Sequence, residues 1–216
     1  MSDNKYKNKI NKEKDKCNKL IKRLYGDVYY FMHGTTSNSI KNILKAGTIK
    51  LGTHTKERNF YTNNMASLPF AYCNIEFDDV PININSNYPL LFPYILLIHP
   101  RIIINHNLIF NKQWSISPTS DSIYINKEDN FNKNKKKLEE IKKSLIEIKN
   151  KTKFEQNYHE ILFKEDINLK DNLLGIIYKY DEDKKYISDL LKKYNYKNIK
   201  IYNNINNFPI LCDLLI

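Results

Sequence analysis

Apolar and polar residues divide the chain into runs typical of buried strands and stripes typical of amphipathic helices. Short apolar, β-branched or aromatic runs predict strands, at 28–32, 48–51, 59–62, 90–99, 101–104, 159–163, 173–178, 198–202 and 209–216. Apolar residues spaced by three and four predict helices, within 1–27 and at 37–46, 63–73, 131–153 and 183–194. The remaining stretches predict loops or turns, at 74–90, 105–130 and 166–170. The pattern indicates an α+β fold with an antiparallel-rich sheet and peripheral helices.

Two of the predicted helices are rich in lysine, one before the first strand and one between the strands at 101–104 and 159–163. Residues 1–27 are interpreted as a basic N-terminal helix that packs one narrow stripe on the domain formed by 28–216. The helix at 131–153 is interpreted as an insertion on the surface of that domain. Its apolar stripe consists of Leu138, Ile141, Leu145 and Ile148. The other faces of both helices are charged, and such faces are usually only solvated.

A strand-to-helix turn near the N-terminus is the most suggestive local pattern. The apolar run 28–32 leads into His33, Gly34 and Thr35, and the helix that follows ends at Gly47. Two residues can serve as its N-cap, Thr36 or Ser37. Because Gly34 has no Cβ and a helix N-terminus favours anions, this turn suits an amide or a phosphate. The alternative is an ordinary turn whose histidine is half exposed.

Length, composition and charge limit the number of hydrophobic cores and the kinds of partner that the chain can have. With 216 residues, 41% of them hydrophobic, the chain can bury a single core. Its net charge of +11 comes almost entirely from lysine. That charge permits nucleic acid, acidic protein or a membrane surface as partner, without choosing among them. The arginines, which favour specific phosphate or base recognition, are only Arg23, Arg58 and Arg101.

The cysteines and the hydropathy pattern indicate an intracellular protein. Cys17, Cys73 and Cys212 are scattered and lack the spacing of a zinc site. We therefore expect reduced thiols in a cytoplasmic or other intracellular compartment, the host cell or nucleus included. No stretch resembles a signal peptide or a membrane span.

Three polar residues next to apolar strands are candidates for chemistry: His33, Tyr61 and Glu160. Glu160 begins an apolar strand, and a carboxylate there is costly to bury unless it lines a cleft or has a partner. An ion pair with a lysine at the sheet's edge is the alternative. Tyr61 and Tyr72 can bring two rings to one pocket, although core packing is the commoner fate of such tyrosines.

Taken together, these pieces resemble the catalytic domain of ADP-ribosyltransferases of the poly(ADP-ribose) polymerase type, whose signature is a His-Tyr-Glu triad. The three motifs correspond to YFMHGTTSNSIKNILKAG, FYTNNMASLPFAYC and YHEILFKEDINL. They occur in the family's order and cover about residues 28–104 and 154–180. The resemblance implies a split antiparallel-rich sheet, with NAD as substrate and no metal.

The resemblance also implies roles for individual residues. His33 would hold the adenosine ribose, and Gly34, with Thr35 beside it, would bind the nicotinamide amide through the backbone. Tyr61 and Tyr72 would stack on the two sides of the nicotinamide ring. The catalytic carboxylate would accept a hydrogen bond from the 2′-hydroxyl of the nicotinamide ribose and stabilise the positive charge that develops there. That carboxylate belongs to Glu160.

The chain departs from the family in three places. Pro69 stands where many members have a serine that binds nicotinamide, and the nearby Ser67 is expected to replace that serine. The lysine-rich helix occupies the loop before Glu160, and the chain continues from Tyr180 to Ile216, beyond the usual end.

The sequence predicts an NAD-dependent ADP-ribosyltransferase, which transfers a pentosyl group and releases nicotinamide. The simplest acceptor is a protein that receives a single ADP-ribose. Three alternatives remain on the same fold: transfer to nucleic acid, removal of an RNA 2′-phosphate, and binding of NAD or ADP-ribose without turnover. The scarcity of arginine argues against removal of a phosphate, and the intact triad argues against a purely binding role.

Overall fold

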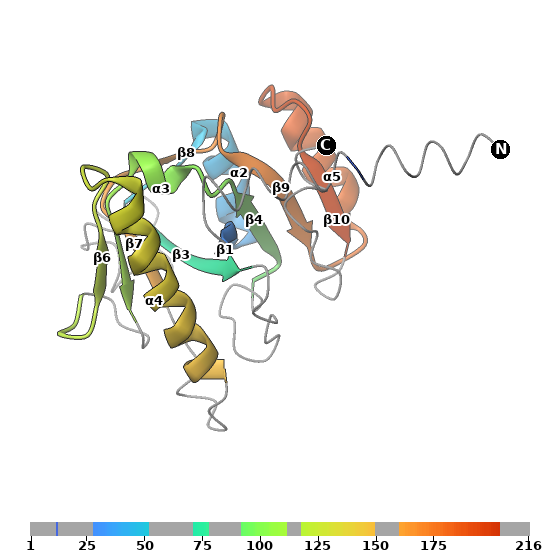
Figure 1. The fold of residues 1–216 in the computed structure, drawn as a ribbon. Coiled ribbons are helices and arrows are strands. Elements are labelled where there is room, and N and C mark those ends of the chain that lie inside the picture. Colours follow the sequence, from blue (N-terminus) through green and yellow to red (C-terminus); the bar gives the residue numbers. More distant parts are fainter. Residues whose placement is uncertain are drawn as a thin grey trace.

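The structure is a computed structural model that describes residue 12 and residues 28–51, 71–77, 92–111, 118–149 and 160–203. These residues form an eight-stranded sheet and a two-stranded sheet (Figure 1). The large sheet has the spatial order β10 (Lys200–Asn203), β9 (Leu173–Tyr178), β4 (Tyr94–Ile98), β1 (Val28–Thr35), β3 (Ala71–Phe77), β7 (Glu160–Phe163), β5 (Leu108–Asn111) and β6 (Ile123–Ile125). The small sheet pairs β2 (Thr48–Ile49) with β8 (Ile167–Asn168).

The described helices are α2 (Ser37–Ala46), α3 (Ile102–Asn105), α4 (Phe131–Lys149) and α5 (Asp183–Lys193). Every pairing in the large sheet is antiparallel except that of β10 with β9. Figure 1 shows the three longer helices, α2, α4 and α5, around the sheet. The predicted α+β fold with an antiparallel-rich sheet is therefore confirmed.

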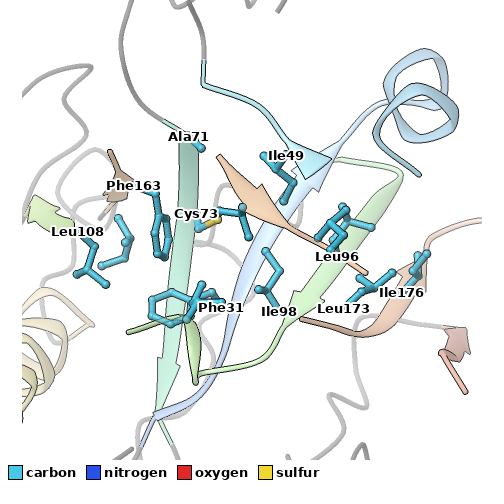
Figure 2. Close-up of a cluster of buried hydrophobic side chains, with 14 of the residues drawn as sticks. Phe31, Ile49, Ala71, Cys73, Leu96, Ile98, Leu108, Phe163, Leu173 and Ile176 are labelled. Carbon is cyan, nitrogen blue, oxygen red and sulfur yellow. The ribbon is translucent and has the colours of Figure 1, made fainter. Parts of the chain in front are cut away.

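The large sheet divides between β1 and β3. The pairing of β1 with β3 ends at Met32, opposite Asn74, whereas β1 continues beside β4 as far as Thr35. Beyond that point β3 pairs with β7 instead, with Cys73 opposite Ile161. Figure 2 shows β1 and β3 close together at one end and diverging toward the other. The backbone that contains His33 thus follows the dividing point directly.

One hydrophobic cluster joins the two parts of the divided sheet. Phe31, Cys73 and Phe163 lie in it (Figure 2), and the rings of Phe31 and Phe163 meet edge to face with centroids 5.3 Å apart. Helices α2, α4 and α5 contribute side chains to the same cluster, namely Ile40, Leu44, Leu138, Ile141, Leu145, Ile187, Leu190 and Leu191. Full burial of one such side chain stabilises the fold by about 1.5–3 kcal/mol. Burial also raises the pKa of the Cys73 thiol, so this thiol stays protonated.

The boundaries of α2 follow from its capping residues, as the sequence predicted. Thr36 is extended, with φ of −90°, and its hydroxyl accepts a hydrogen bond from the amide of Ser39. Gly47 ends the helix with φ of +71°, a left-handed conformation that glycine adopts without strain. These two caps fix where β1 ends and where the N-terminus of α2 lies.

Two predictions around residue 73 are wrong. The helix expected over 63–73 is contradicted at 71–73, and the loop expected over 74–90 is contradicted at 74–77, because β3 occupies Ala71–Phe77. The sequence there alternates apolar and polar residues from Cys73 onward, as a strand does. Pairing with β1 and β7 decides the conformation, which local spacing left ambiguous.

Two further predictions are wrong between residues 101 and 130. The run of isoleucines at 101–104 was expected to be a strand, but 102–105 form the short helix α3. The amide of Ile103 donates to the carbonyl of Pro100, and the fixed φ of proline favours such a turn over strand continuation. The loop expected over 105–130 contains β5 and β6. Both are short strands that gain stability from pairing rather than from length.

The turn expected over 166–170 is also wrong in part, because β8 occupies two of its residues and pairs with β2. Most other predictions of helices and strands within the described residues are confirmed. Strands were expected near the places now occupied by β1, β2, β4, β7, β9 and β10, and helices near α2, α4 and α5. The buried stripe of α4 includes Leu138, Ile141 and Leu145, and the side chain of Asn130 accepts a hydrogen bond from the amide of Lys133 at its start. Other predictions lie outside the described residues: the strands at 59–62 and 209–216, and the N-terminal helix apart from the helical Lys12.

His99, just after β4, is held in its neutral form. Its Nδ1 accepts a hydrogen bond of 2.9 Å from the amide of Arg101. Burial, with a smaller contribution from the charge of Arg101, lowers the pKa of His99 to about 4. In the unfolded chain the pKa is about 6.5, so the unfolded state binds a proton more readily. The contribution of His99 to the free energy of unfolding is therefore fully present above pH ~6.5 and is lost as the pH drops toward 4.

We expect His99→Asn to make the protein less sensitive to acid. The amide oxygen of asparagine can accept the same hydrogen bond but does not titrate in this range. Between pH 7 and pH 4, the free energy of unfolding should fall by about 1–2 kcal/mol less in the variant, a figure already reduced for partial exposure of the ring. Urea unfolding of both proteins at the two pH values measures this difference. Equal losses would mean that His99 does not carry the acid sensitivity.

Candidate functional site

Glu160 is a buried carboxylate at the first position of β7. Only 4% of its surface is exposed, and the three residues that follow it in the strand are fully buried. Strand β7 lies between β3 and β5, so Glu160 is not at an edge of the sheet. An isolated ionised carboxylate is costly in such a place, which makes Glu160 a candidate for function or for a specific partnership.

A polar row crosses the sheet at the level of Glu160. Asn111, the last residue of β5, is directly opposite Glu160 and is fully buried. Its Oδ1 accepts a hydrogen bond of 2.6 Å from the hydroxyl of Ser122. That hydroxyl in turn accepts one of 2.8 Å from the amide of Thr119. The sequence analysis missed Asn111 because it lies in a predicted loop; an Asn that closes the apolar run Leu-Ile-Phe was the available signal.

The His-Gly-Thr sequence lies where the sheet divides, and its three residues are the last ones of β1 rather than the turn that the sequence predicted. His33 and Gly34 are half-buried and lie opposite Leu96 and Ile95 of β4, whereas Thr35 is buried. Helix α2 begins two residues after Thr35 and has no acidic residue in its first turn. The positive end of its dipole is therefore available to an anionic group.

Tyr94 holds the N-termini of α2 and α5 together beside the end of β1. It is opposite Thr35 and buried, and its phenol hydroxyl accepts a hydrogen bond from Ser37 and donates one to Asp183. Burial, with a contribution from Asp183, raises the pKa of Tyr94 to about 12, so the phenol remains protonated. The residues before α2 are thus supported by a fixed hydrogen bond.

His33 and Glu160 lie on strands that are not neighbours in the sheet. Strand β3 lies between their strands, which corresponds to about 10 Å between backbones. Alternation along β1 puts His33 on the face of Phe31, and alternation along β7 puts Glu160 on the face opposite Ile161. Phe31 and Ile161 share the core cluster, so the two candidate side chains start from opposite faces. Both, however, border the division of the sheet.

Of the remaining predicted site residues, Tyr72 alone lies within the described part of the chain. Tyr61 and Ser67 lie outside the described residues. Tyr72 lies in β3, opposite Leu162, so its expected position on a helix is wrong. Its strand nevertheless runs between those of His33 and Glu160.

In the described part of the chain, no group of three or more His, Cys, Asp or Glu side chains is arranged to hold a metal ion. None of the helices among those residues has both the length and the apolar character needed to cross a membrane.

Solved structures of DarT from Thermus sp. 2.9 share this fold. The complex of DarT with NAD+ matches with a TM-score of 0.54 and 11% sequence identity, covering 82% of this chain and 95% of that one. The complex with ADP-ribosylated single-stranded DNA matches with a TM-score of 0.53 and 11% identity, covering 82% and 94%. At this identity the likeness establishes an ADP-ribosyltransferase-like fold.

Two comparisons of sequence identify the family. The uncharacterized protein R11 of Acanthamoeba polyphaga mimivirus is 32% identical over 230 residues, which cover 97% of this chain and 83% of R11. The model of a family of unknown function, DUF5846, matches residues 27–148, more than half of the chain. The chain therefore belongs to the DUF5846 family.

Proposed function

We propose that the protein is an NAD-dependent ADP-ribosyltransferase. The observation that carries this proposal is Glu160, a buried carboxylate that opens an interior strand beside the division of an ADP-ribosyltransferase-like sheet. The DarT structure with NAD+ has the same fold, which supports NAD as the substrate. The proposal also includes the assignment to the transferases with a His-Tyr-Glu triad and the roles of the individual residues.

In the proposed reaction the bond between C1′ of the nicotinamide ribose and the nicotinamide nitrogen breaks. The bond's electrons leave with nicotinamide, which departs neutral. An acceptor oxygen or nitrogen then bonds to C1′ and releases its proton to solvent or to a base. Positive charge develops on the ribose as the first bond weakens, and a fixed carboxylate at Glu160 stabilises it.

The other residues bind and orient NAD in this proposal. His33 contacts the adenosine ribose, and the backbone of Gly34 and Thr35 binds the nicotinamide amide. Because His33 and Glu160 are assigned to different riboses, they need not touch each other, which agrees with their separation across β3. Tyr61, Tyr72 and Ser67 complete the binding of nicotinamide.

Single-stranded nucleic acid is now the first acceptor to test, ahead of a protein. The sequence analysis favoured a protein, but no finding supports one, whereas one structural neighbour is a complex with ADP-ribosylated single-stranded DNA. The net charge of +11 also suits a polyanion. On α4 the basic side chains exposed to solvent include Lys135, Lys136 and Lys143, whereas Lys133 and Lys137 form ion pairs with Asp129.

Glu160→Gln should abolish transfer while leaving NAD binding nearly unchanged. The amide has the same shape but lacks the charge, so the loss falls on the transition state and should be about 100-fold or more, or about 3 kcal/mol. Release of nicotinamide and calorimetric binding of NAD measure the two properties.

Glu165→Gln is the matched control for Glu160→Gln. Glu165 lies just beyond the same strand, where its carboxylate binds Asn107 and Lys127. We expect this control to lose some stability but to keep its activity. Parental turnover by Glu160→Gln would remove this carboxylate from the mechanism, and NAD binding without turnover in the parent would favour a binding module.

His33→Ala should weaken NAD binding by about tenfold with little effect on the melting temperature, because the side chain is half-buried beside the proposed ribose site. His106→Ala is its control. That histidine is also half-buried, but its ring contacts Phe163 and two backbone carbonyls within the fold. The control should lose stability and bind NAD normally. The reverse pattern in the two variants would assign His33 to the core.

Replacing Lys135, Lys136 and Lys143 of α4 by Gln should slow modification of single-stranded DNA by roughly three- to tenfold at low salt, and less at high salt. Hydrolysis of NAD without an acceptor should not change. The same substitutions at Lys184, Lys192 and Lys193 of α5, which remove equal charge, are the control. If both triple variants modify DNA like the parent, α4 is only a solvated helix.

A further inference from the structure

Asn111 and Glu160 are neighbours in the antiparallel ladder of β5 and β7. The amide of Lys164 donates to the carbonyl of Asn107, which makes these opposite residues a hydrogen-bonded pair. Such pairs recur at every second position, so Asn111 and Glu160 form one too, with Cα atoms about 5.5 Å apart. Side chains of opposite residues leave the sheet on the same face and can touch.

Their surroundings are apolar. Ile109 and Leu162, two residues along each strand on the same face, are almost fully buried. Asn111 is 0% exposed and Glu160 is 4% exposed. A carboxylate in such a place needs donors to remain ionised, and a primary amide provides two N–H groups.

The hydrogen bond from Ser122 determines which end of the amide is left for Glu160. The Oδ1 atom of Asn111 can only accept, so Ser122 must donate to it. Thr119 holds Ser122 in place, because the amide of Thr119 donates to the Ser122 hydroxyl and the amide of Ser122 donates to the carbonyl of Thr119. With Oδ1 occupied on the side of β6, Nδ2 is directed away from Ser122.

We infer that Asn111 is a positioning residue for Glu160: its Nδ2 donates a hydrogen bond to the carboxylate and holds it ionised and oriented. Ser122, directly before β6, supports this contact through its hydrogen bond to Oδ1. The inference rests on the proposed function and adds a residue that acts on NAD only through Glu160.

On this face of β5, β6 and β7, the other described titratable side chains are farther away. Lys164, just past the end of β7, is four residues along the chain and about 13 Å from Glu160, and its Nζ lies 6.0 Å from the centre of the Tyr124 ring. Tyr124 is opposite Ile109 on β6. Among the described side chains of β5 and β6, Asn111 is therefore the one placed to donate to Glu160.

Asn111→Asp in the full-length protein tests the inference. The substitution keeps the acceptor for Ser122 but puts a second carboxylate beside Glu160, where like charges disfavour ionisation. We expect kcat for NAD hydrolysis at pH 7 to fall at least tenfold with KM nearly unchanged, and the acid limb of the pH–rate profile to move up by about one pH unit. Ser122→Ala keeps Asn111 but removes its support. This variant should move the acid limb of the pH–rate profile in the same direction, by less than Asn111→Asp does.

Asn107→Asp is the matched control. Asn107 directly precedes the same strand and donates to another carboxylate, that of Glu165, with Nδ2 at 2.9 Å from Oε1. The Asn107→Asp variant should be less stable than the parent, but the acid limb of its pH–rate profile should not move. Parallel profiles for the parent, Asn111→Asp and Ser122→Ala would overturn the inference.

A direct titration separates this inference from the proposed function. In protein labelled with 13C at the glutamate carboxyl carbons, the signal of Glu160 is the one missing from Glu160→Gln. Asn111→Asp should shift the titration of that signal to higher pH, and Asn107→Asp should not. If the parent does not turn over NAD but the signal shifts, the proposed function fails and the contact stands. An unshifted signal would refute the contact whatever the activity.

Discussion

The change of partner along β3 is the constraint on which the rest of the structure depends. Its first residues pair with β7, and its later residues pair with β1. Backbone hydrogen-bonding groups must be satisfied somewhere, so a strand that leaves one neighbour must join another. This exchange divides the sheet just before His33 and places β7, with Glu160 at its start, on the other side of the division.

The hydrophobic cluster makes this divided arrangement rigid. Phe31 of β1 meets Phe163 of β7 across β3, and Cys73 lies between the diverging strands (Figure 2). Three helices pack side chains into the same cluster. Because a close-packed core resists small displacements, the two borders of the division keep a fixed relation. A carboxylate fixed in that way is what stabilisation of a developing positive charge requires.

The polar residues near Glu160 show how the burial of a charge can be tolerated. Asn111 ends β5, Ser122 directly precedes β6, and the two are linked by a hydrogen bond of 2.6 Å. A second Asn–Glu contact, between Asn107 and Glu165, closes the other end of the same strand pair. The two contacts differ in burial: Glu160 is almost fully enclosed, whereas Glu165 is half-buried beside Lys127. Because its carboxylate is buried, Glu160 rather than Glu165 is the candidate for function.

The sequence by itself determined the elements whose signal is local. The caps Thr36 and Gly47 fixed α2, the stripe of Leu138, Ile141 and Leu145 fixed α4, and the run from Leu173 to Tyr178 fixed β9. It also identified Glu160 as an unusual carboxylate. Only the tertiary structure decided that 71–77 form a strand and that Asn111 lies opposite Glu160. The physical reason is that strand pairing joins residues far apart in the chain, and its free energy exceeds the small local preferences that spacing and propensity reveal.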